Sequence, residues 1–502
     1  MPSSRRQQFR SAFRQMLAVE TLESRAMLAG NVTASVSKGT LLIKGDAEAN
    51  EIILSQTSTT TGAFTLTPVA GSNTTINGGT VAVDFTSVVR VTIKMDAGND
   101  QVGIGNSVEF INELFTAFED FGSEEEEEPG LQAVDEEDTP PSEEDPEFSI
   151  LNFFGGDDED EGFDISDPDF TPQQLSQLPT RVTGQTVVDL GDGDDMFVSM
   201  LRSNSNLVLD GGKGSDAILS MLSTVGNMTI DADPVKGSGM GSDLVAVVLS
   251  SIRGDLAITT EGESDGVLVL GSKVSNFGVN VGGATTGGLV DDDLVVISSL
   301  YAADNVGVQT EVGDDGVYVD DIVADTFRIV TGEGDDEVEV VGAALLNLMI
   351  ETAGGEDWVS LNAGEDGLIP LVIRRNLGIN TGADDDSIEI DGGLLGMLVG
   401  GIMDVRAGAG EDELLLYRTS VGRNATIDME AGNDVAIVDS LDARVDLALS
   451  MSAGNDILSV RNLSAKNYLL KGGTGNDTLH DLGDHQDEFS GTQFEHTDDG
   501  TV

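Results

Sequence analysis

Aspartate recurs at a nearly constant spacing from residue 187 onward, each time after a glycine-rich segment. The clearest copies are Gly191-Asp-Gly-Asp-Asp195, Gly212-Lys-Gly-Ser-Asp216, Gly332-Glu-Gly-Asp-Asp336, Gly408-Ala-Gly-Glu-Asp412 and Gly473-Thr-Gly-Asn-Asp477. We name the last aspartate of each copy an anchor; the thirteen anchors are Asp195, Asp216, Asp243, Asp265, Asp293, Asp315, Asp336, Asp357, Asp386, Asp412, Asp434, Asp456 and Asp477. Carboxylates beside the carbonyls of a tight turn are ligands that calcium prefers. The chemistry that this pattern offers is cation binding.

The anchor spacing predicts the elements that position these residues. Successive anchors are 21, 27, 22, 28, 22, 21, 21, 29, 26, 22, 22 and 21 residues apart. Because every exception to 21 or 22 is longer, the series indicates a coil of fixed length with occasional loop insertions. The residue two positions after every anchor is apolar, and apolar residues at alternate positions indicate a strand with one buried face. Each unit is therefore predicted to be a strand, a Gly/Asp turn, a strand and a variable return.

A single unit of this kind cannot bury its apolar face, whereas stacked units can. The predicted fold class is all-β: a parallel β-solenoid, expected to be a right-handed β-helix of about 21–22 residues per coil. The alternative is a series of antiparallel sandwich domains. Such domains would not be expected to keep one turn motif at constant spacing through thirteen copies.

Stacking also predicts a need for counter-charge. Equivalent residues of neighbouring coils lie about 4.8 Å apart, where two carboxylates repel by roughly 0.9 kcal/mol in water and about 3.5 kcal/mol at an effective dielectric of 20. Glycine stands two residues before the anchor in ten of the thirteen copies. It suits a positive-φ turn whose carbonyls point inward. A row of calcium ions would neutralise the carboxylates.

Two copies extend the pattern to nine residues. Gly472-Gly-Thr-Gly-Asn-Asp-Thr-Leu-His480 and Gly211-Gly-Lys-Gly-Ser-Asp-Ala-Ile-Leu219 resemble the RTX, or haemolysin-type, calcium-binding repeat G-G-x-G-x-D-x-U-x. In that family the aspartate and the turn carbonyls bind calcium between stacked turns. The resemblance implies that Asp477 and Asp216 are calcium ligands and extends less directly to the other anchors. That family repeats every nine residues, with turns on both edges. Here one motif recurs per coil, so we expect one row of ions along one edge.

The predicted metal ligands include ten of the anchors and eight turn glycines. They are Asp195, Asp216, Asp243, Asp315, Asp336, Asp357, Asp412, Asp434, Asp456, Asp477, Gly191, Gly193, Gly212, Gly214, Gly332, Gly334, Gly473 and Gly475. Asp265, Asp293 and Asp386 are left out, and the copies that end at Asp265 and Asp293 lack the glycine pattern. The alternative interpretation is that all these segments are ordinary β-turns, in which Gly, Asn and Asp are common.

Composition divides the chain into five segments. Residues 1–30 are basic and amphipathic, 31–105 form an N-terminal β region of degenerate repeats or a cap, 181–482 hold the repeats, and 483–502 are an acidic tail. Residues 106–180 contain no Lys or Arg before Thr180 and carry runs such as Glu124–Glu128, so we expect a disordered acidic insertion. Its phenylalanines could dock on a partner, although a solvated linker is the simpler interpretation.

The end of the basic segment carries a second resemblance. Thr21-Leu-Glu-Ser-Arg-Ala-Met-Leu-Ala-Gly30 is similar to the LEPR-XLL segment at the N-termini of large exported planctomycete proteins. Ser24 stands where that family usually has proline. The resemblance implies export, and we expect a secreted, extracellular or cell-surface protein.

The overall charge and composition disfavour several classes of partner and of active site. The 25 Lys and Arg against 90 Asp and Glu give a formal charge of −65, which disfavours nucleic acid and anionic membranes as partners. The chain has no Cys, its three His lie near the C-terminus, and no apolar run is long enough to span a bilayer. We therefore expect a non-enzymatic, calcium-binding protein with a structural or adhesive role, whose partners are calcium and a cell-surface polysaccharide or protein.

The alternative function is a polysaccharide lyase or glycoside hydrolase, since parallel β-helices also carry such enzymes. Pairs of carboxylates, which glycoside hydrolysis requires, are so abundant here that their presence does not distinguish an enzyme from a structural protein. The notable basic pair, Arg374 and Arg375, is expected in an insertion at residues 362–378, and the sole tryptophan, Trp358, offers no sugar-stacking platform by itself.

Overall fold

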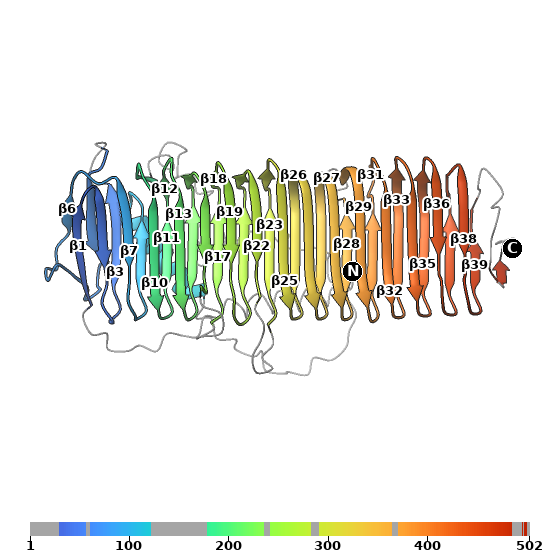
Figure 1. Cartoon of the computed structure of the whole chain (residues 1–502), viewed down its shortest axis with the longest axis horizontal. Coiled ribbons are helices and arrows are strands. Elements are labelled where there is room, and N and C mark those ends of the chain that lie inside the picture. Colours follow the sequence, from blue (N-terminus) through green and yellow to red (C-terminus); the bar gives the residue numbers. More distant parts are fainter. Residues whose placement is uncertain are drawn as a thin grey trace, which may run out of the picture.

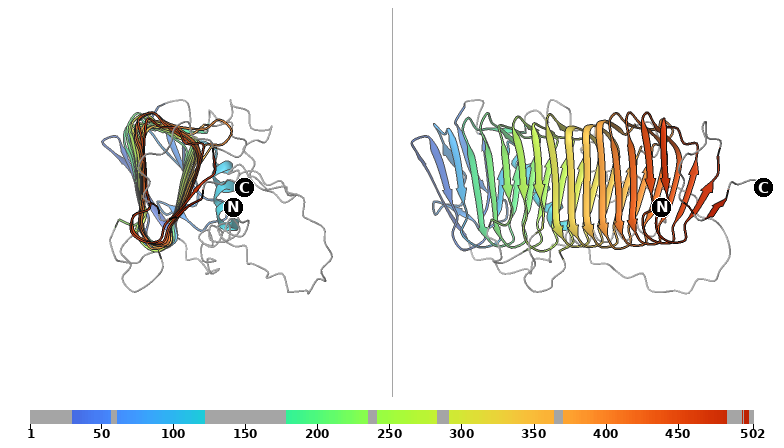
Figure 2. Two further views of the ribbon diagram at one scale, coloured as in Figure 1. Left: turned by 90° about the vertical axis from the view of Figure 1, so that its right-hand side faces the viewer. Right: turned by 45° about the vertical axis from the view of Figure 1, so that its right-hand side comes forward.

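The computed structural model describes residues 30–56, 61–121, 178–234, 241–282, 291–363, 370–483, 494 and 496–498. Apart from helix α2 (Val108–Phe121), the regular secondary structure of these residues is β-strand, and most strand pairs are parallel. Successive coils stack along one long axis (Figure 1). Viewed along that axis, the coils superimpose on an elongated triangle with one narrow end (Figure 2). The all-β class and the parallel pairing predicted from the sequence are confirmed.

Each coil contains a strand that leads into the Gly/Asp turn and a strand that follows it, and most coils also have a third, usually short, strand segment that the sequence did not predict. The pre-turn strands are β2 (Thr40–Lys44), β7 (Arg90–Lys94), β10 (Thr186–Asp192), β13 (Leu207–Lys213), β16 (Met228–Asp231), β19 (Asp255–Thr259), β22 (Asn276–Asn280), β25 (Asn305–Val312), β29 (Val372–Ala383), β32 (Met403–Ala409), β34 (Ala425–Ala431), β36 (Asp446–Ser450) and β38 (Asn467–Lys471). The post-turn strands are β3 (Glu51–Gln56), β8 (Gln101–Ile104), β11 (Met196–Ser199), β14 (Ala217–Met221), β17 (Leu244–Val248), β20 (Gly266–Leu270), β23 (Leu294–Ser298), β28 (Trp358–Asn362), β30 (Ser387–Asp391), β33 (Glu413–Val421), β35 (Val435–Ala443), β37 (Ile457–Arg461) and β39 (Thr478–Asp481).

The short strands are β9 (Thr180–Arg181), β12 (Leu201–Arg202), β15 (Thr224–Val225), β18 (Ser251–Ile252), β21 (Lys273–Val274), β24 (Tyr301–Ala302) and β31 (Met397–Val399). Two long strands, β26 (Gly316–Glu333) and β27 (Glu337–Gly354), each include the post-turn strand, the third side and the next pre-turn strand. They pair with each other in one constant register, with only single residues left unpaired. Strands of only two residues leave no alternation in the sequence, which is why the third side of the coil was missed.

The register places equivalent repeat residues on top of one another. In β14 and β17, for example, Ile218 pairs with Val245, and each is the residue two positions after an anchor. All thirteen residues at that position belong to one continuous core cluster and are at most 2% exposed. The prediction that one face of each post-turn strand is buried is confirmed.

The N-terminal β region joins the same stack. Strands β7 and β8 pair in parallel with β10 and β11, although residues 106–180 separate them in sequence. The first coil is closed by antiparallel pairs that involve β1 (Asn31–Ser37), β4 (Phe64–Pro68) and β6 (Val83–Phe85), while β5 (Thr75–Ile76) pairs with β1 in parallel. Residues 31–105 therefore combine a continuation of the repeats with a terminal cap.

Part of the predicted disordered insertion is helical. Helix α2 (Val108–Phe121) packs Phe110, Ile111 and Leu114 against outward-facing residues such as Val198 and Met200 of the third coil. Apolar residues at helical spacing had been interpreted as an alternation of acids and aromatics, so the helix was missed. Residues 122–177 and 1–29, which include the acidic runs and the LEPR-XLL-like segment, lie outside the described residues.

The predicted acidic tail also contributes an element, since β40 (His496–Asp498) pairs in parallel with β39. None of the helical structure in the described ranges is long and apolar enough to cross a bilayer.

We expect the N-terminal coil to depend on Asp100, whose Oδ1 accepts the N–H of Asn50 at 2.6 Å. Asp100→Ala leaves this buried N–H without an acceptor. Amide hydrogen exchange in β3 should become at least about tenfold faster. Asp100→Asn keeps an oxygen acceptor and should exchange like the wild type. Unchanged amide exchange in the alanine variant would contradict the continuity of the anchor column between residues 31–105 and the repeats.

Candidate metal-binding edge

The thirteen anchors lie in one column along the narrow edge of the coil, which we name the turn edge. The main-chain N–H of each anchor donates to Oδ1 of the anchor in the following coil, at 2.8–3.2 Å in every step from Asp195 to Asp477. Asp100 donates to Asp195 at 2.6 Å, so the column extends through Asp100 to Asn50. The carboxylates are in vertical register, as the spacing predicted.

Three anchors that the ligand prediction left out belong to this column. Asp265, Asp293 and Asp386 are at most 2% exposed and make the same two hydrogen bonds as their neighbours. Absence of the glycine pattern led to the omission of Asp265 and Asp293. The stack imposes the turn conformation on these copies, so the aspartate spacing was the better signal.

Burial makes the column electrostatically unfavourable. Loss of solvent is the main cause that raises the pKa of Asp195, Asp265 and Asp336 to about 8, and neighbouring carboxylates raise it further. At Asp216 and Asp243 the same causes raise the pKa well above its ordinary value. Near neutral pH these groups therefore tend to take up a proton or require a cation.

Six anchors offer one oxygen beyond the hydrogen bond that fixes them. Their Oδ1 accepts the N–H of the preceding coil, whereas their Oδ2 is buried without a hydrogen-bond partner among the described residues. Such oxygens occur at Asp195, Asp216, Asp243, Asp293, Asp412 and Asp434. Buried oxygens without donors are rare in folded proteins and suit a cation.

The turn glycines bring a second row of oxygens to the same edge. A Cβ added at Gly432 would lie 1.4 Å from the carbonyl oxygen of Gly410 and 2.8 Å from Oδ1 of Asp434. Glycine is required because the carbonyl oxygen occupies the position that a Cβ would take, with the carboxylate close to the same position. Within the part of the chain that the structure describes, the carbonyl oxygens of Gly410, Gly432 and Gly454 accept no main-chain hydrogen bond outside the strands.

The predicted glycine ligands share this geometry. Gly191, Gly193, Gly212, Gly214, Gly332, Gly334, Gly473 and Gly475 all have positive φ. Where another residue replaces the first glycine, it keeps the left-handed backbone, with φ 93° at Glu311 and 108° at Ala353. Alanine rarely adopts this conformation, so the neighbouring coils must hold the turn in place.

A second, exposed column runs beside the anchors. The residue before each anchor often accepts a hydrogen bond from the next coil, as when Asp335 donates its N–H to Oδ1 of Asp314 and Glu356 donates to Asp335. This direction is opposite to that of the buried column. The turn edge therefore presents two parallel rows of side-chain oxygens. The Asp-Asp and Asn-Asp pairs of the sequence contained this signal, which was not used.

Buried threonines were also missed by the sequence prediction. Thr310, Thr331, Thr352 and Thr381 lie five residues before an anchor. Their hydroxyls lower the pKa of that anchor and partly offset the effect of burial. Their spacing from the anchors could have identified them.

The chemistry available at this edge is coordination by mixed oxygens. No three His, Asp or Glu side chains in the described ranges gather into one metal-binding cluster. A cation here would take carboxylate oxygens from one or two coils and complete its shell with carbonyl oxygens and water, as calcium does. The oxygens present fit such an ion.

The residues weighed for catalysis lie elsewhere. Arg374 and Arg375 were predicted to lie in a loop insertion, but both are exposed residues of strand β29. The pairing of β29 with β27 continues on either side of them, with an irregularity in register at this point. Trp358 begins β28 and is half-buried. Comparison with known proteins adds no assignment, since no family model, curated protein or solved structure matches the chain.

The close approach of carbonyls predicts an unequal response to alanine. Gly454→Ala places a Cβ 1.4 Å from the carbonyl oxygen of Gly432, and we expect it to lower the free energy of unfolding by more than about 2 kcal/mol. Gly278→Ala on β22 meets nothing within 4 Å and should be neutral. Urea unfolding measures both variants, and equal midpoints would contradict the stacking of the turns.

The raised pKa values predict the pH dependence of the metal-free protein. Folding raises the pKa of anchors such as Asp195 and Asp357 to between about 6 and 8, so the folded state binds more protons than the unfolded state. The protons bound by the anchors therefore stabilise the folded state. Their contribution to the free energy of unfolding is fully present below about pH 4 and is lost as the pH rises through the folded pKa values. In EDTA, melting temperatures measured by circular dichroism should fall between pH 5 and pH 8. A rise over that range would contradict the burial of ionisable anchors.

Proposed function

We propose that this chain is a secreted or cell-surface parallel β-solenoid that binds a row of calcium ions along its turn edge and serves a structural or adhesive role. One observation carries the proposal: buried carboxylate oxygens without hydrogen-bond partners stand in register beside turn carbonyls. The RTX-like nonapeptides at Asp216 and Asp477 support it independently. In contrast to the RTX repeat, one turn per coil gives one row of ions.

Calcium would act as the counter-charge of the column. In the low calcium of a cytoplasm, the carboxylates would oppose stacking, and the chain would fold loosely. Extracellular calcium would neutralise the turns and stabilise the stack by binding only the folded state. Affinities of about 10⁻⁴–10⁻³ M, typical of extracellular modules, are sufficient.

We expect calcium to raise stability strongly at neutral and alkaline pH. At pH 8 the β content and melting temperature should be higher in millimolar calcium than in EDTA, and the difference should shrink towards pH 5 as protons replace calcium at the anchors. Equal β content and melting temperature in both buffers at pH 8 would refute the proposal. Magnesium, which prefers a rigid octahedral shell with water, should stabilise less.

A single anchor provides the matched test of the site. Asp434→Asn keeps an oxygen that accepts the N–H of Asp412 but removes the charge, so calcium stoichiometry by calorimetry should fall while the metal-free protein at pH 8 is at least as stable. Glu413→Gln removes an equal charge from an exposed position on β33 in the preceding coil and should leave stoichiometry unchanged. Equal stoichiometry in the two variants would place the ions elsewhere.

A further inference from the structure

Five cationic side chains are stacked at one corner of the C-terminal coils, where the third side of the coil meets the pre-turn strand. We name Arg374, Arg375, Arg423, Arg444 and Lys466 the cation corner. Main-chain hydrogen bonds connect it coil by coil: Gly401 donates to the Arg375 carbonyl at 2.6 Å and Arg423 to the Gly401 carbonyl at 2.9 Å. Val445, next to Arg444, donates to Arg423, and Lys466 donates to Val445. Cations widely spaced in sequence therefore form one row.

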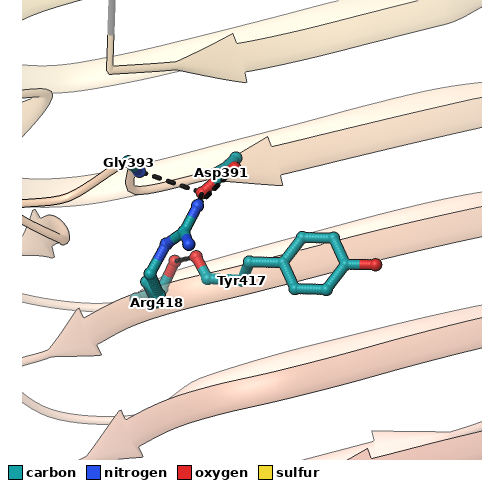
Figure 3. Close-up of polar contacts among 5 residues, drawn as sticks. Asp391, Gly393, Tyr417 and Arg418 are labelled. Atoms are coloured by element: carbon teal, nitrogen blue, oxygen red, sulfur yellow. Dashed lines mark hydrogen bonds and ion pairs between the residues drawn. The ribbon is translucent and has the colours of Figure 1, made fainter. Parts of the chain in front are cut away.

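These cations are exposed and unpaired. All five side chains are solvent-exposed, and none forms an ion pair within the described ranges. Other arginines of the same coils are neutralised: Arg461 pairs with Asp439 at 2.9 Å, and Arg418 reaches across to Asp391, which also accepts the N–H of Gly393 (Figure 3). In a chain with a formal charge of −65, a row of unpaired cations is unexpected unless it serves a ligand.

The positions between the cations carry no side chains. Gly400, Gly401 and Gly422 occupy the positions between Arg374 or Arg375 and the next arginines. A Cβ there would lie 2.2–2.4 Å from a carbonyl oxygen of the preceding coil, so the close stacking of the main chain requires glycine. No side chain of these three residues therefore separates one cation from the next along the row.

The corner is also well separated from the acidic turn edge. Strand β34 begins two residues after Arg423 and ends directly before Gly432, so the two lie at opposite ends of the same strand. Seven residues of strand span about 23 Å, more than two Debye lengths at physiological salt. The anchors therefore do not cancel the positive charge at the corner.

We propose that the cation corner binds an acidic polysaccharide, an extended chain that carries sulfate or carboxylate groups. Guanidinium groups suit these anions. An asparagine follows three of the cations, as Asn376, Asn424 and Asn467. The amides of Asn376 and Asn467 already donate to Asn347 and Asp446, and the amide of Asn424 suits a sugar hydroxyl. Single-stranded nucleic acid binding needs aromatic stacking platforms, and residues 374–376, 400–402, 422–424, 444–445 and 465–467 contain no aromatic side chain. The inference gives the adhesive role in the proposed function its ligand class and rests on it.

The test uses the full chain in saturating calcium with dextran sulfate as the probe and neutral dextran as the control polymer. Wild type should bind dextran sulfate, with affinity that falls as salt rises, and should ignore dextran. Arg423→Glu/Arg444→Glu should weaken binding at least about tenfold, which corresponds to two reversed charges at a mainly electrostatic site. Arg423→Gln/Arg444→Gln should have an intermediate effect.

The matched control reverses two exposed cations on the short strands of earlier coils, Arg202→Glu/Lys273→Glu, and should bind within about twofold of wild type. An equal loss of affinity for dextran sulfate in both double variants would show that binding follows net charge alone and would overturn the cation corner as the binding site. Absence of wild-type binding, or equally tight binding of a single-stranded oligonucleotide, would overturn the ligand class. Calcium stoichiometry and melting temperature of the same variants keep the two proposals distinguishable, because failure of the corner leaves both at wild-type values.

Discussion

The structure depends on one buried hydrogen bond that repeats once per coil, from the main-chain N–H of an anchor aspartate to the carboxylate of the next anchor. This bond fixes the vertical register of the turns and, through them, of the strands on either side. Because the acceptor is an ionisable side chain, the same contact that orders the coils brings like charges together in a dry environment. The register and its electrostatic cost are therefore inseparable.

The glycines are a consequence of this arrangement. At Gly432 the carbonyl of the preceding coil approaches the position that a Cβ would occupy, so the tight stacking of turns requires the absence of a side chain. At Ala353 a side chain is present and the backbone is nevertheless left-handed. A few such residues are tolerated because neighbouring coils on both sides over-determine the turn.

The period and the buried faces could be predicted because both are encoded in every copy, as a constant anchor interval and an apolar residue two positions later. Asp265 and Asp293 were omitted as ligands because their own copies lack the glycine pattern, although their conformation is set by neighbours that are distant in sequence. Helix α2 was missed because its apolar residues lie among acids. The cation corner was missed because the sequence separates Arg375 from Arg423 by two coils, and only the stacking of the corner brings them into one row.

The counter-charge of the anchor column has to come from solution. On the outer faces the chain supplies its own, as in the pair between Arg328 and Glu351. At the turn edge it cannot in this way, because the glycines two residues before anchors such as Asp434 and Asp456 stand where a carbonyl excludes a Cβ. Lys213, the last residue of β13, pairs with the exposed Asp192. A basic side chain long enough to reach Oδ2 would have to displace the carbonyl that shapes the turn. Only a proton or a small cation can neutralise the column without disrupting the stack, and a divalent ion that binds oxygen in flexible geometry meets this requirement at a pH where protons are scarce.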